Sequence, residues 1–422
     1  MINKTTNILH KKLNKIKQKN LSHKLDNILK AKDLSTKIIY KIIKNKPSIN
    51  EINYYIDNSA NPPKLVTDPN LIKKFIENKF LNTFNNVTQE KNISIWLNDC
   101  PIIKENYKET INFSVLQITK TLTTRQNSAP GIDKIHFDMF KFLKSNNSII
   151  FKLISKLYTS IYRLHYIPIS WKKGITSLIP KADSTVINNW RPITLLNTLY
   201  KGFTLIINYH LQKSLTDNQI IPPEQCGFNK NQDTSIAITA YIESIKKSIT
   251  TKSPLHVLYI DFKAAFDSVQ HWVLKSIMNH IKLDNNLKKM IENIMSNSHT
   301  NIKTIKGMST DIPINTGVKQ GDPLSPTLFL LYLILIQWHI KKTFPNNIYN
   351  FNHLCYADDM ILLAQNRPQL TLMLNNLITY CNFTDMNINE KKSIYSYTND
   401  HPQPPMTINT LTPMNQIKTP KL

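Results

Sequence analysis

The stretch HLCYADDMILLA, residues 353–364, places two adjacent carboxylates, Asp358 and Asp359, between two short apolar runs. Each run has the length of a short strand, so the stretch predicts a tight hairpin with the carboxylates at its tip. A second apolar run, LHVLYID, predicts a buried strand that ends at Asp261. These strand ends can bring three carboxylates to one place, where they repel one another unless a multivalent cation lies among them.

Carboxylate oxygens are hard ligands, so the predicted cation is Mg²⁺, with Mn²⁺ as the alternative. Two such ions can activate an attacking hydroxyl group and stabilise a leaving oxygen in phosphoryl transfer. Taken alone, an Asp-Asp pair is also typical of an ordinary turn, where Asp is common. The other motifs of the chain decide between these interpretations.

Composition and charge narrow the class of protein. The 422 residues are 41% hydrophobic, which is typical of a globular chain. The net charge of +25 favours a polyanionic partner, nucleic acid before a membrane surface, although part of it reflects a general richness in lysine. The longest apolar run, residues 328–338, is too short to span a bilayer, so we expect a buried core helix and no membrane partner.

Cysteine usage and the N-terminus bear on the compartment. The 4 cysteines are widely scattered without a CxxC pair, which argues against both a zinc site and a disulfide framework. An intracellular, reducing compartment is therefore expected. The first 20 residues are basic but have no apolar segment, so they are not a secretory signal; a mitochondrial transit peptide stays open.

Two further motifs carry candidate binding residues. TGVKQGDPLSPTLF, residues 316–329, holds two of the chain's 7 glycines, which indicates a close backbone approach, and its Gln320 can reach a base or sugar. IPKADSTVINNWRPITLL, residues 179–196, supplies Lys181 and Arg191, a point charge and a guanidinium of the kind that a triphosphate needs. The plainer interpretations are an ordinary helix entry, a solvated lysine and an arginine stacked on Trp190.

Together these motifs resemble the reverse transcriptase domain of non-LTR (LINE-type) retrotransposons. The resemblance covers about 270 residues and consists of seven blocks in the family's order. They are SAPGIDKIHFDMF (128–140), WKKGITSLIPKADSTVINNWRPITLLNTLYKGF (171–203), QCGFNKNQDTSIAI (225–238), LYIDFKAAFDSV (258–269), GVKQGDPLSPTLF (317–329), YADD (356–359) and MNINEKKS (386–393).

The resemblance implies an RNA-directed DNA polymerase that extends a DNA primer with dNTPs on an RNA template. It implies that two Mg²⁺ ions are held by Asp261, Asp358 and Asp359, the catalytic residues, with the backbone carbonyl of Phe262 as a further ligand. It implies further roles for eight residues: nucleotide binding for Lys181, Arg191, Phe266, Gln320, Gly321 and Lys392, and proximity to the primer end for Tyr356 and Ala357.

For two of these residues the resemblance implies a particular role, and each also has a simpler structural explanation. Phe266 stands where the family places a steric gate against the ribose 2′-OH, and it is otherwise a core phenylalanine. Lys392 matches a candidate acid for protonating pyrophosphate, and it is otherwise a surface lysine of a lysine-rich chain.

The expected fold class is α+β, a right-hand polymerase with fingers and a palm whose antiparallel sheet is backed by helices. We expect a basic helical extension at 1–110, fingers at 111–250, a palm at 251–398 and a tail at 399–422 that leads towards a primer grip. The thumb is expected to be missing, and no endonuclease or Cys/His knuckle is predicted. Asp385 stands where the family usually has Gly, at a position that favours a positive φ.

Three other interpretations stay open. One is an RNA-binding maturase of the group II intron type, and another is an inactive, truncated copy of an element. The third is a metal-dependent nuclease, which would not need Lys181, Arg191 or the loop around Gln320. A polymerase of a eukaryotic element would act in the nucleus; protein partners are not predicted.

Overall fold

The computed structural model describes residues 52, 55–57, 64–105, 107, 110–125, 128–145, 149–180, 190–229, 232–344, 349 and 351–398. The chain divides into two compact units, 1–50 and 51–422, and all described residues belong to the second. None of the helices in this described part is long and apolar enough to cross a membrane.

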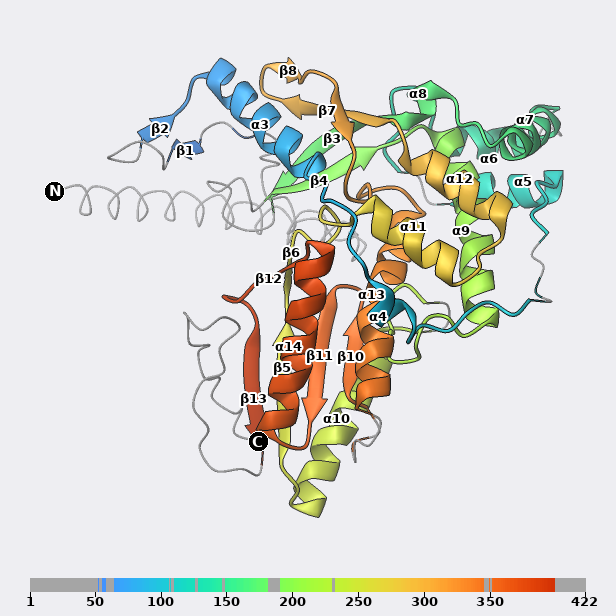
Figure 1. The fold of residues 1–422 in the computed structure, drawn as a ribbon. Helices are drawn as coiled ribbons and strands as arrows, with labels where there is room; N and C mark the ends of the chain where they lie inside the picture. The colour runs from blue at the N-terminus through green and yellow to red at the C-terminus, as the bar shows by residue number, and fades with distance from the viewer. Residues whose placement is uncertain are drawn as a thin grey trace, which may run out of the picture. The chain divides into compact units, whose positions relative to one another are not determined.

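An antiparallel sheet, here called the palm sheet, carries the predicted hairpin (Figure 1). Its strand order is β10-β11-β5-β13. The strands are β5 (Leu255–Ile260), β10 (His353–Tyr356), β11 (Asp359–Ala364) and β13 (Ile394–Thr398). The hairpin and the buried strand before Asp261 are confirmed, because β10 pairs with β11 and β11 pairs with β5.

Helices cover both faces of the palm sheet. Leu258 and Ile260 belong to the main core together with residues of α14 (Arg367–Thr384). Leu255 and Val257 alternate with them along β5 and form a second core that includes residues of α10 (Thr234–Thr251). The predicted core helix is confirmed as α13 (Ser325–Thr343), which is buried on nearly all sides because its sequence is apolar all round.

A second sheet, here called the finger sheet, lies beside the first in the chain's second unit. It combines β3 (Lys173–Pro180), β4 (Trp190–Leu195), β7 (Ser298–Thr304), β8 (Gly307–Met308) and β9 (Ile312–Ile314). β3 pairs antiparallel with β4 and parallel with β7. The sequence did not predict β7, β8 and β9.

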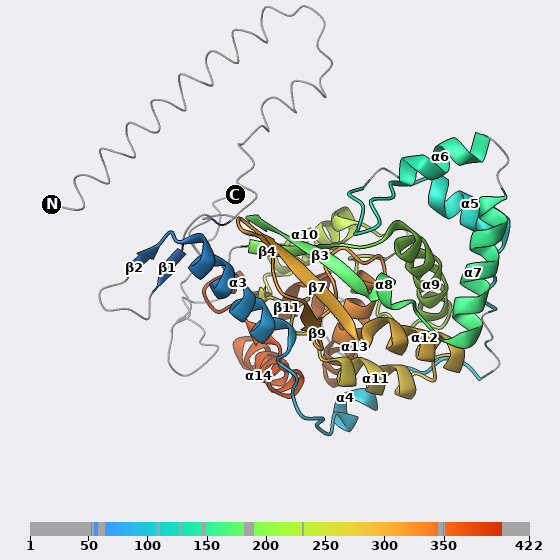
Figure 2. The same cartoon turned by 90° about the horizontal axis from the view of Figure 1, so that it is seen from above.

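The helix α3 (Pro69–Phe84) lies along the finger sheet beside β7 and β9 (Figure 2). Its buried side chains form one core with apolar residues of the sheet: Ile72, Ile76, Phe80, Phe84, Leu178, Trp190, Ile302, Ile312 and Ile314 are members. The helix begins after Asp68, whose carboxylate accepts two backbone N–H bonds as an N-cap. The core between α3 and the sheet thus joins segments that were assigned to the extension, the fingers and the palm; the domain boundaries themselves stay a prediction.

The prediction of helices over residues 1–110 holds only in part. Residues 1–50 lie outside the described residues. In the described part α3 is helical as predicted, but β1 (Tyr55–Asp57) and β2 (Lys64–Val66) form an antiparallel pair. The stretch 85–93 has no regular secondary structure. It contains Asn85, Asn86 and Asn92, which compete with the helix by hydrogen bonding to nearby backbone.

The other described elements complete the fingers and the helical layers. They are α4 (Ser94–Leu97), α5 (Val115–Thr123), α6 (Phe137–Ser145), α7 (Ile150–Leu164), α8 (Ile169–Lys172), α9 (Thr198–Asp217), β6 (Phe262–Lys263), α11 (His271–His280), α12 (Asn285–Met295) and β12 (Asn387–Ile388).

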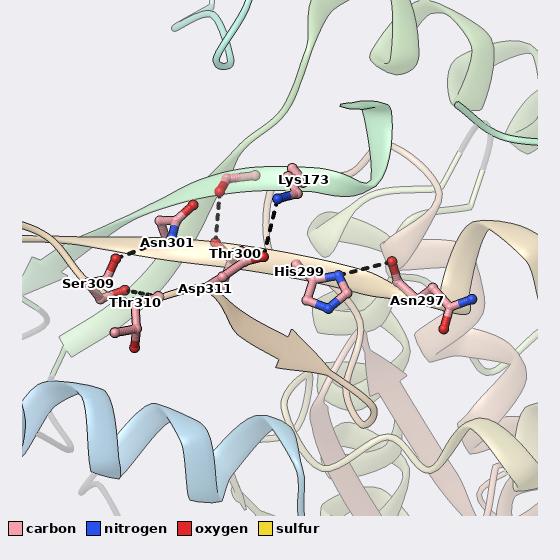
Figure 3. A network of polar contacts seen from close by, with 9 residues as sticks. Lys173, Asn297, His299, Thr300, Asn301, Ser309, Thr310 and Asp311 are labelled. Carbon is pink, nitrogen blue, oxygen red and sulfur yellow. Dashed lines mark hydrogen bonds and ion pairs between the residues drawn. The ribbon is translucent and has the colours of Figure 1, made fainter. Parts of the chain in front are cut away.

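Polar contacts connect the strands around β7 in the finger sheet (Figure 3). Lys173 on β3 pairs with Asp311 at 3.2 Å, and the Thr300 hydroxyl donates to the carbonyl of Gly174. Asn301 on β7 donates from Nδ2 to the carbonyl of Ser309 at 3.2 Å. These bonds tie β7 to its neighbours through side chains as well as through the backbone ladder.

Asp385 shows how this chain accommodates its departure from glycine. It ends α14 in the left-handed region, with φ +59°, where Asp is tolerated better than most residues. Its carboxylate accepts hydrogen bonds from Asn86 at 2.7 Å and from Gln270 at 3.4 Å. The Asp therefore ties the segment after α3 to the end of α14, a contact that glycine could not make.

Candidate active site

Two carboxylates, those of Asp261 and Asp359, stand where β5 ends and β11 begins, and Asp358 directly precedes the second. Asp261 follows β5 directly, and Asp359 is the first residue of β11. The register pairs Ile260 with Met360, so the next residues, Asp261 and Asp359, stand opposite one another. Like charges directly opposite on neighbouring strands are destabilising. The fold thus brings Asp261 and Asp359 together, with Asp358 directly before Asp359 in the turn.

The electrostatics of the site reflect this convergence. Burial raises the pKa of Asp359, and the neighbouring carboxylates of Asp358 and Asp261 raise it further. A cation among the three groups would relieve this repulsion, which no hydrogen bond to a neutral group can do as well.

Asp261 is held in place by the loop after β12. Asn389 donates from Nδ2 to the Asp261 carboxylate at 2.6 Å and from its backbone N–H to the Asp261 carbonyl at 2.7 Å. The Ser393 hydroxyl accepts the backbone N–H of Asp261 at 3.2 Å. Sequence reasoning missed both residues; their place in the block MNINEKKS was the only signal.

The donor chemistry of the site fits a divalent cation. Asp261, Asp358 and Asp359 supply hard oxygen ligands, and Phe262 follows Asp261 directly as the first residue of β6. Among the residues that the structure describes, however, no three Asp, Glu, His or Cys side chains are grouped so that they could hold one ion. The observation that supports a divalent cation here is the raised pKa of Asp359, to which the carboxylates of Asp358 and Asp261 contribute.

Two neighbouring residues at the turn of the hairpin differ in exposure. Ala357 is buried and adopts φ +59°, whereas Tyr356 beside it is exposed. Tyr356 therefore lies at the surface opposite Asp359, and its place near a primer end stays a prediction. Gln225 contacts this turn from a segment 132 residues away and was also missed.

The loop 316–324 is fixed between β4 and the segment after β6. Gln320 accepts the backbone N–H of Thr194 at 2.7 Å, and its side chain donates to Asp267 at 3.3 Å. Gly321 has φ +125°, and a Cβ there would lie 2.3 Å from the carbonyl oxygen of Thr194. The close backbone approach predicted from the glycines is thus confirmed, with β4 as the neighbour.

Phe266 is half-buried beside this loop. Its ring stacks on Phe329 with centroids 4.7 Å apart, and its carbonyl accepts the backbone N–H of Val318 at 2.8 Å. The core interpretation and the gate interpretation are therefore compatible, because one edge of a half-buried ring stays accessible.

Two further predicted nucleotide ligands, Arg191 and Lys392, are exposed. Arg191 is exposed on β4, three residues before Thr194, which contacts the loop. Lys392 is exposed, and its backbone N–H donates to the carbonyl of Asn389 at 3.0 Å. Lys181 lies outside the described residues.

Polar contacts on both sides of Gln320 and Gly321 hold the loop 316–324 in place. Burial lowers the pKa of Lys319 to about 8, and its ammonium group lies 3.4 Å from the carbonyl of Lys172. Tyr200 donates a 2.5 Å hydrogen bond to Asp322. These residues anchor both ends of the segment that presents Gln320 and Gly321.

Buried His353 predicts a pH dependence of stability. It begins β10, its Nδ1 lies 2.7 Å from Asn352 Oδ1, and its Nε2 has no hydrogen-bond partner among the described residues. Burial lowers its pKa from 6.5 to about 4, so between these values the unfolded chain binds a proton that the native chain does not. The free energy of unfolding should fall by on the order of 3 kcal/mol as the pH drops through this window.

Denaturant unfolding of His353→Gln at pH 7 and pH 4.5 checks this expectation. The His353→Gln variant should lose less stability over that interval than the wild type. The control His136→Gln, at a half-buried histidine outside the palm sheet, should lose as much stability as the wild type. Equal losses for all three chains would contradict it.

Comparisons with known proteins place this site in a family. The family model "Reverse transcriptase (RNA-dependent DNA polymerase)" matches residues 179–410, more than half of the chain. The Pol polyprotein of the type-1 retrotransposable element R2 from Popillia japonica is 30% identical over 254 residues, which are 57% of this chain and 35% of that protein. A probable RNA-directed DNA polymerase from transposon X-element of Drosophila melanogaster is 27% identical over 52% of this chain and 24% of its own length.

The Xenopus laevis transposon TX1 149 kDa protein is 22% identical over 85% of this chain and 28% of its own length. The chain thus spans about a third or less of the length of these relatives. Among solved structures, a telomerase from Candida tropicalis, in complex with a fragment of telomeric RNA, is 16% identical with a TM-score of 0.44 and covers 65% of this chain and 47% of its own.

The family model covers both the carboxylate hairpin and the loop that faces it. The expected fold class is confirmed, and so is the resemblance found in the motifs. The chain belongs to the reverse transcriptase family, with the α+β right-hand polymerase fold, and its domain is that of the non-LTR retrotransposons.

Proposed function

We propose that this chain is an RNA-directed DNA polymerase that transfers nucleotides from dNTPs to a DNA 3′-OH on an RNA template. The observation that carries the proposal is the meeting of Asp261 with Asp358 and Asp359 at adjoining strand ends, within the reverse transcriptase domain. The net charge of +25 supports nucleic acid as template and primer.

The three carboxylates and the Phe262 carbonyl would hold two Mg²⁺ ions, with Mn²⁺ as a substitute. Bound ions of this kind make a hydroxyl group a better nucleophile and neutralise charge on a transferred phosphoryl group. Asn389 and Ser393 orient Asp261 for this task, because together they bind its carboxylate, its carbonyl and its N–H. Positioning of this kind is a large part of phosphoryl-transfer catalysis.

The nucleotide would bind between the carboxylates and the loop 316–324. Gln320 and Gly321 would line one wall, with Phe266 below the sugar. The exposed side chains of Arg191 and Lys392 would face the phosphates, and the same role stays a prediction for Lys181. Tyr356 and Ala357 would lie beside the primer end.

Replacing Phe266 with Ala should weaken discrimination against ribonucleotides. The ring is half-buried and held by Phe329, so its removal opens space without removing a charge or a metal ligand. The ratio of kcat/KM for dATP to that for ATP should fall by about tenfold or more. Single-nucleotide incorporation measures this ratio, with Phe329→Leu as a control for lost packing; unchanged selectivity in Phe266→Ala would remove the gate assignment.

Primer extension tests the proposed function itself. The purified chain is incubated with an RNA template, an annealed DNA primer, dNTPs and Mg²⁺, and products are resolved by length. We expect elongation that stops at the template end and fails when Mg²⁺ is chelated. A chain that binds the template–primer with Mg²⁺ or Mn²⁺ present but adds no nucleotide would overturn the proposal.

A further inference from the structure

One fully buried side chain reaches the turn of the carboxylate hairpin. Gln225 is 0% exposed and lies in the segment QCGF, which precedes α10. Its Oε1 accepts the backbone N–H of Ala357 and that of Gly227, each at 3.0 Å. Its Nε2 donates to the carbonyl of Ala357 at 3.3 Å. A single amide thus pairs with both peptide groups of the residue before Asp358.

These bonds matter because Ala357 is in an unusual state. It is buried with φ +59°, a region that residues with a Cβ adopt rarely. The strand ladder pairs Tyr356 with Asp359, so the peptide groups of Ala357 lie in the turn, outside the ladder. A buried peptide group without a partner is costly, and the Gln225 amide provides the partner for both.

The segment around Gln225 is itself fixed to the hairpin. Cys226 donates its N–H to the carbonyl of Cys355 at 2.8 Å, and Cys355 donates to the carbonyl of Glu224 at 2.9 Å. The segment therefore extends the palm sheet beyond β10 by a short parallel bridge. The Gln225 side chain is held on a backbone that cannot move independently of the hairpin.

Gly227 makes the close approach possible. A Cβ at this position would lie 2.1 Å from the backbone nitrogen of Ala357 and 2.8 Å from the carbonyl carbon of Tyr356. Both are backbone atoms of the turn, so any larger residue would displace the turn itself. The glycine is needed here for space rather than for a positive φ.

We infer that Gln225 is a positioning residue for the reaction: its amide sets the turn at Ala357 and thereby the placement of Asp358 and Asp359, and Gly227 gives it room. The inference rests on the proposed polymerase function for its kinetic consequences, but not for its structural ones. Gln225 contacts the turn and not the reacting atoms, so it acts through the two carboxylates.

The first test needs no activity. Hydrogen exchange of the full chain is followed in peptides that cover residues 353–361, for the wild type, Gln225→Met and the control Gln337→Met. Methionine has nearly the size of glutamine but neither donates nor accepts these bonds. Gln337 is an equally buried glutamine under the same strand, near Cys355, and makes none of the three bonds to the turn.

Gln225→Met should speed exchange in these peptides by about tenfold or more, while exchange in β5 and α13 stays as in the wild type. Gln337→Met should leave exchange at the turn unchanged. If Gln225→Met proves unable to fold, Gly227→Ala serves instead, because it displaces the turn with a single methyl group. Unchanged exchange at the turn, or a uniform rise across the whole domain, would overturn the inference.

The second test is kinetic. Gln225→Met should lower kcat by on the order of tenfold to a hundredfold and raise the Mg²⁺ concentration at half-maximal rate, with KM for dNTP and affinity for template–primer unchanged. A residue that only stabilises the fold would lower the active fraction and leave the Mg²⁺ dependence as it is. If the wild type itself shows no extension, the proposed function fails, and the exchange experiment still decides whether Gln225 holds the turn.

Discussion

Asp358→Asn is expected to lower the rate of nucleotide incorporation by at least about a thousandfold while the dissociation constant for template–primer changes by no more than about twofold. The substitution keeps the shape of the side chain and removes one of three mutually repelling charges. Metal binding at the hairpin depends on that charge, whereas affinity for nucleic acid depends on the basic surface of a chain with net charge +25.

The same variant should not be less stable than the wild type. In the absence of metal the Asp358 carboxylate helps to raise the pKa of Asp359, so its loss removes an unfavourable interaction. Rapid-quench incorporation, fluorescence anisotropy with labelled template–primer and thermal unfolding measure the three quantities. Asp138→Asn, at an exposed carboxylate that pairs with Lys141 on α6, is the matched control and should be neutral in all three.

Two outcomes would contradict the metal-site interpretation. Incorporation within about tenfold of the wild type would mean that Asp358 does not hold a catalytic ion. Loss of template–primer binding together with activity would mean that the hairpin acts in binding rather than in catalysis.

The sequence could predict the site because its signals are local. The alternation of apolar runs and carboxylates in residues 353–364 determines the hairpin, and the apolar run before Asp261 determines the strand beside it. The convergence of the three carboxylates follows once both strands share a sheet. The buried helix α13 could be predicted as well, because the apolar residues of its sequence lie on all sides of the helix.

The strands of the finger sheet at residues 298–314 gave no such signal. Three of the four buried positions of β7 are the polar residues Ser298, Thr300 and Thr304, and only Ile302 is apolar, so the period-2 alternation is hidden in a polar sequence. The Thr176 hydroxyl lies 2.7 Å from that of Thr300 and 3.0 Å from that of Thr194, which satisfies these groups inside the sheet. Only the tertiary structure supplies the partner of Thr300, because Thr176 lies 124 positions away in the chain.

Contacts that position the site were missed for the same reason. Gln225 and Ala357 are separated by 132 positions, and Asp261 and Asn389 by 128. A sequence motif can mark such residues as members of a block, but the partner of a side chain in a remote block is decided by the sheet that brings both together.

Gly321→Ala is expected to lower kcat/KM for dNTP by about a hundredfold and to destabilise the fold. Gly321 has φ +125°, and a Cβ would lie 2.3 Å from the Thr194 carbonyl oxygen, a backbone atom of the strand β4, which is paired with β3. The loop must then move away from β4, which breaks the 2.7 Å hydrogen bond from Thr194 to Gln320. Gln320 would leave its place in the proposed nucleotide site.

The control Gly307→Ala shows how much of the effect of Gly321→Ala comes from backbone strain alone. Gly307 also has a positive φ, +86°, but an added Cβ there would have no atom within 4 Å. Its substitution should cost about 1–3 kcal/mol of stability through strain alone and leave kcat/KM unchanged. Steady-state incorporation and denaturant unfolding of both variants compare the two effects. If the two alanines had the same effect on kcat/KM, the approach of Gly321 to Thr194 would be irrelevant to catalysis; a loss confined to Gly321→Ala means that β4 positions Gln320 for the incoming nucleotide.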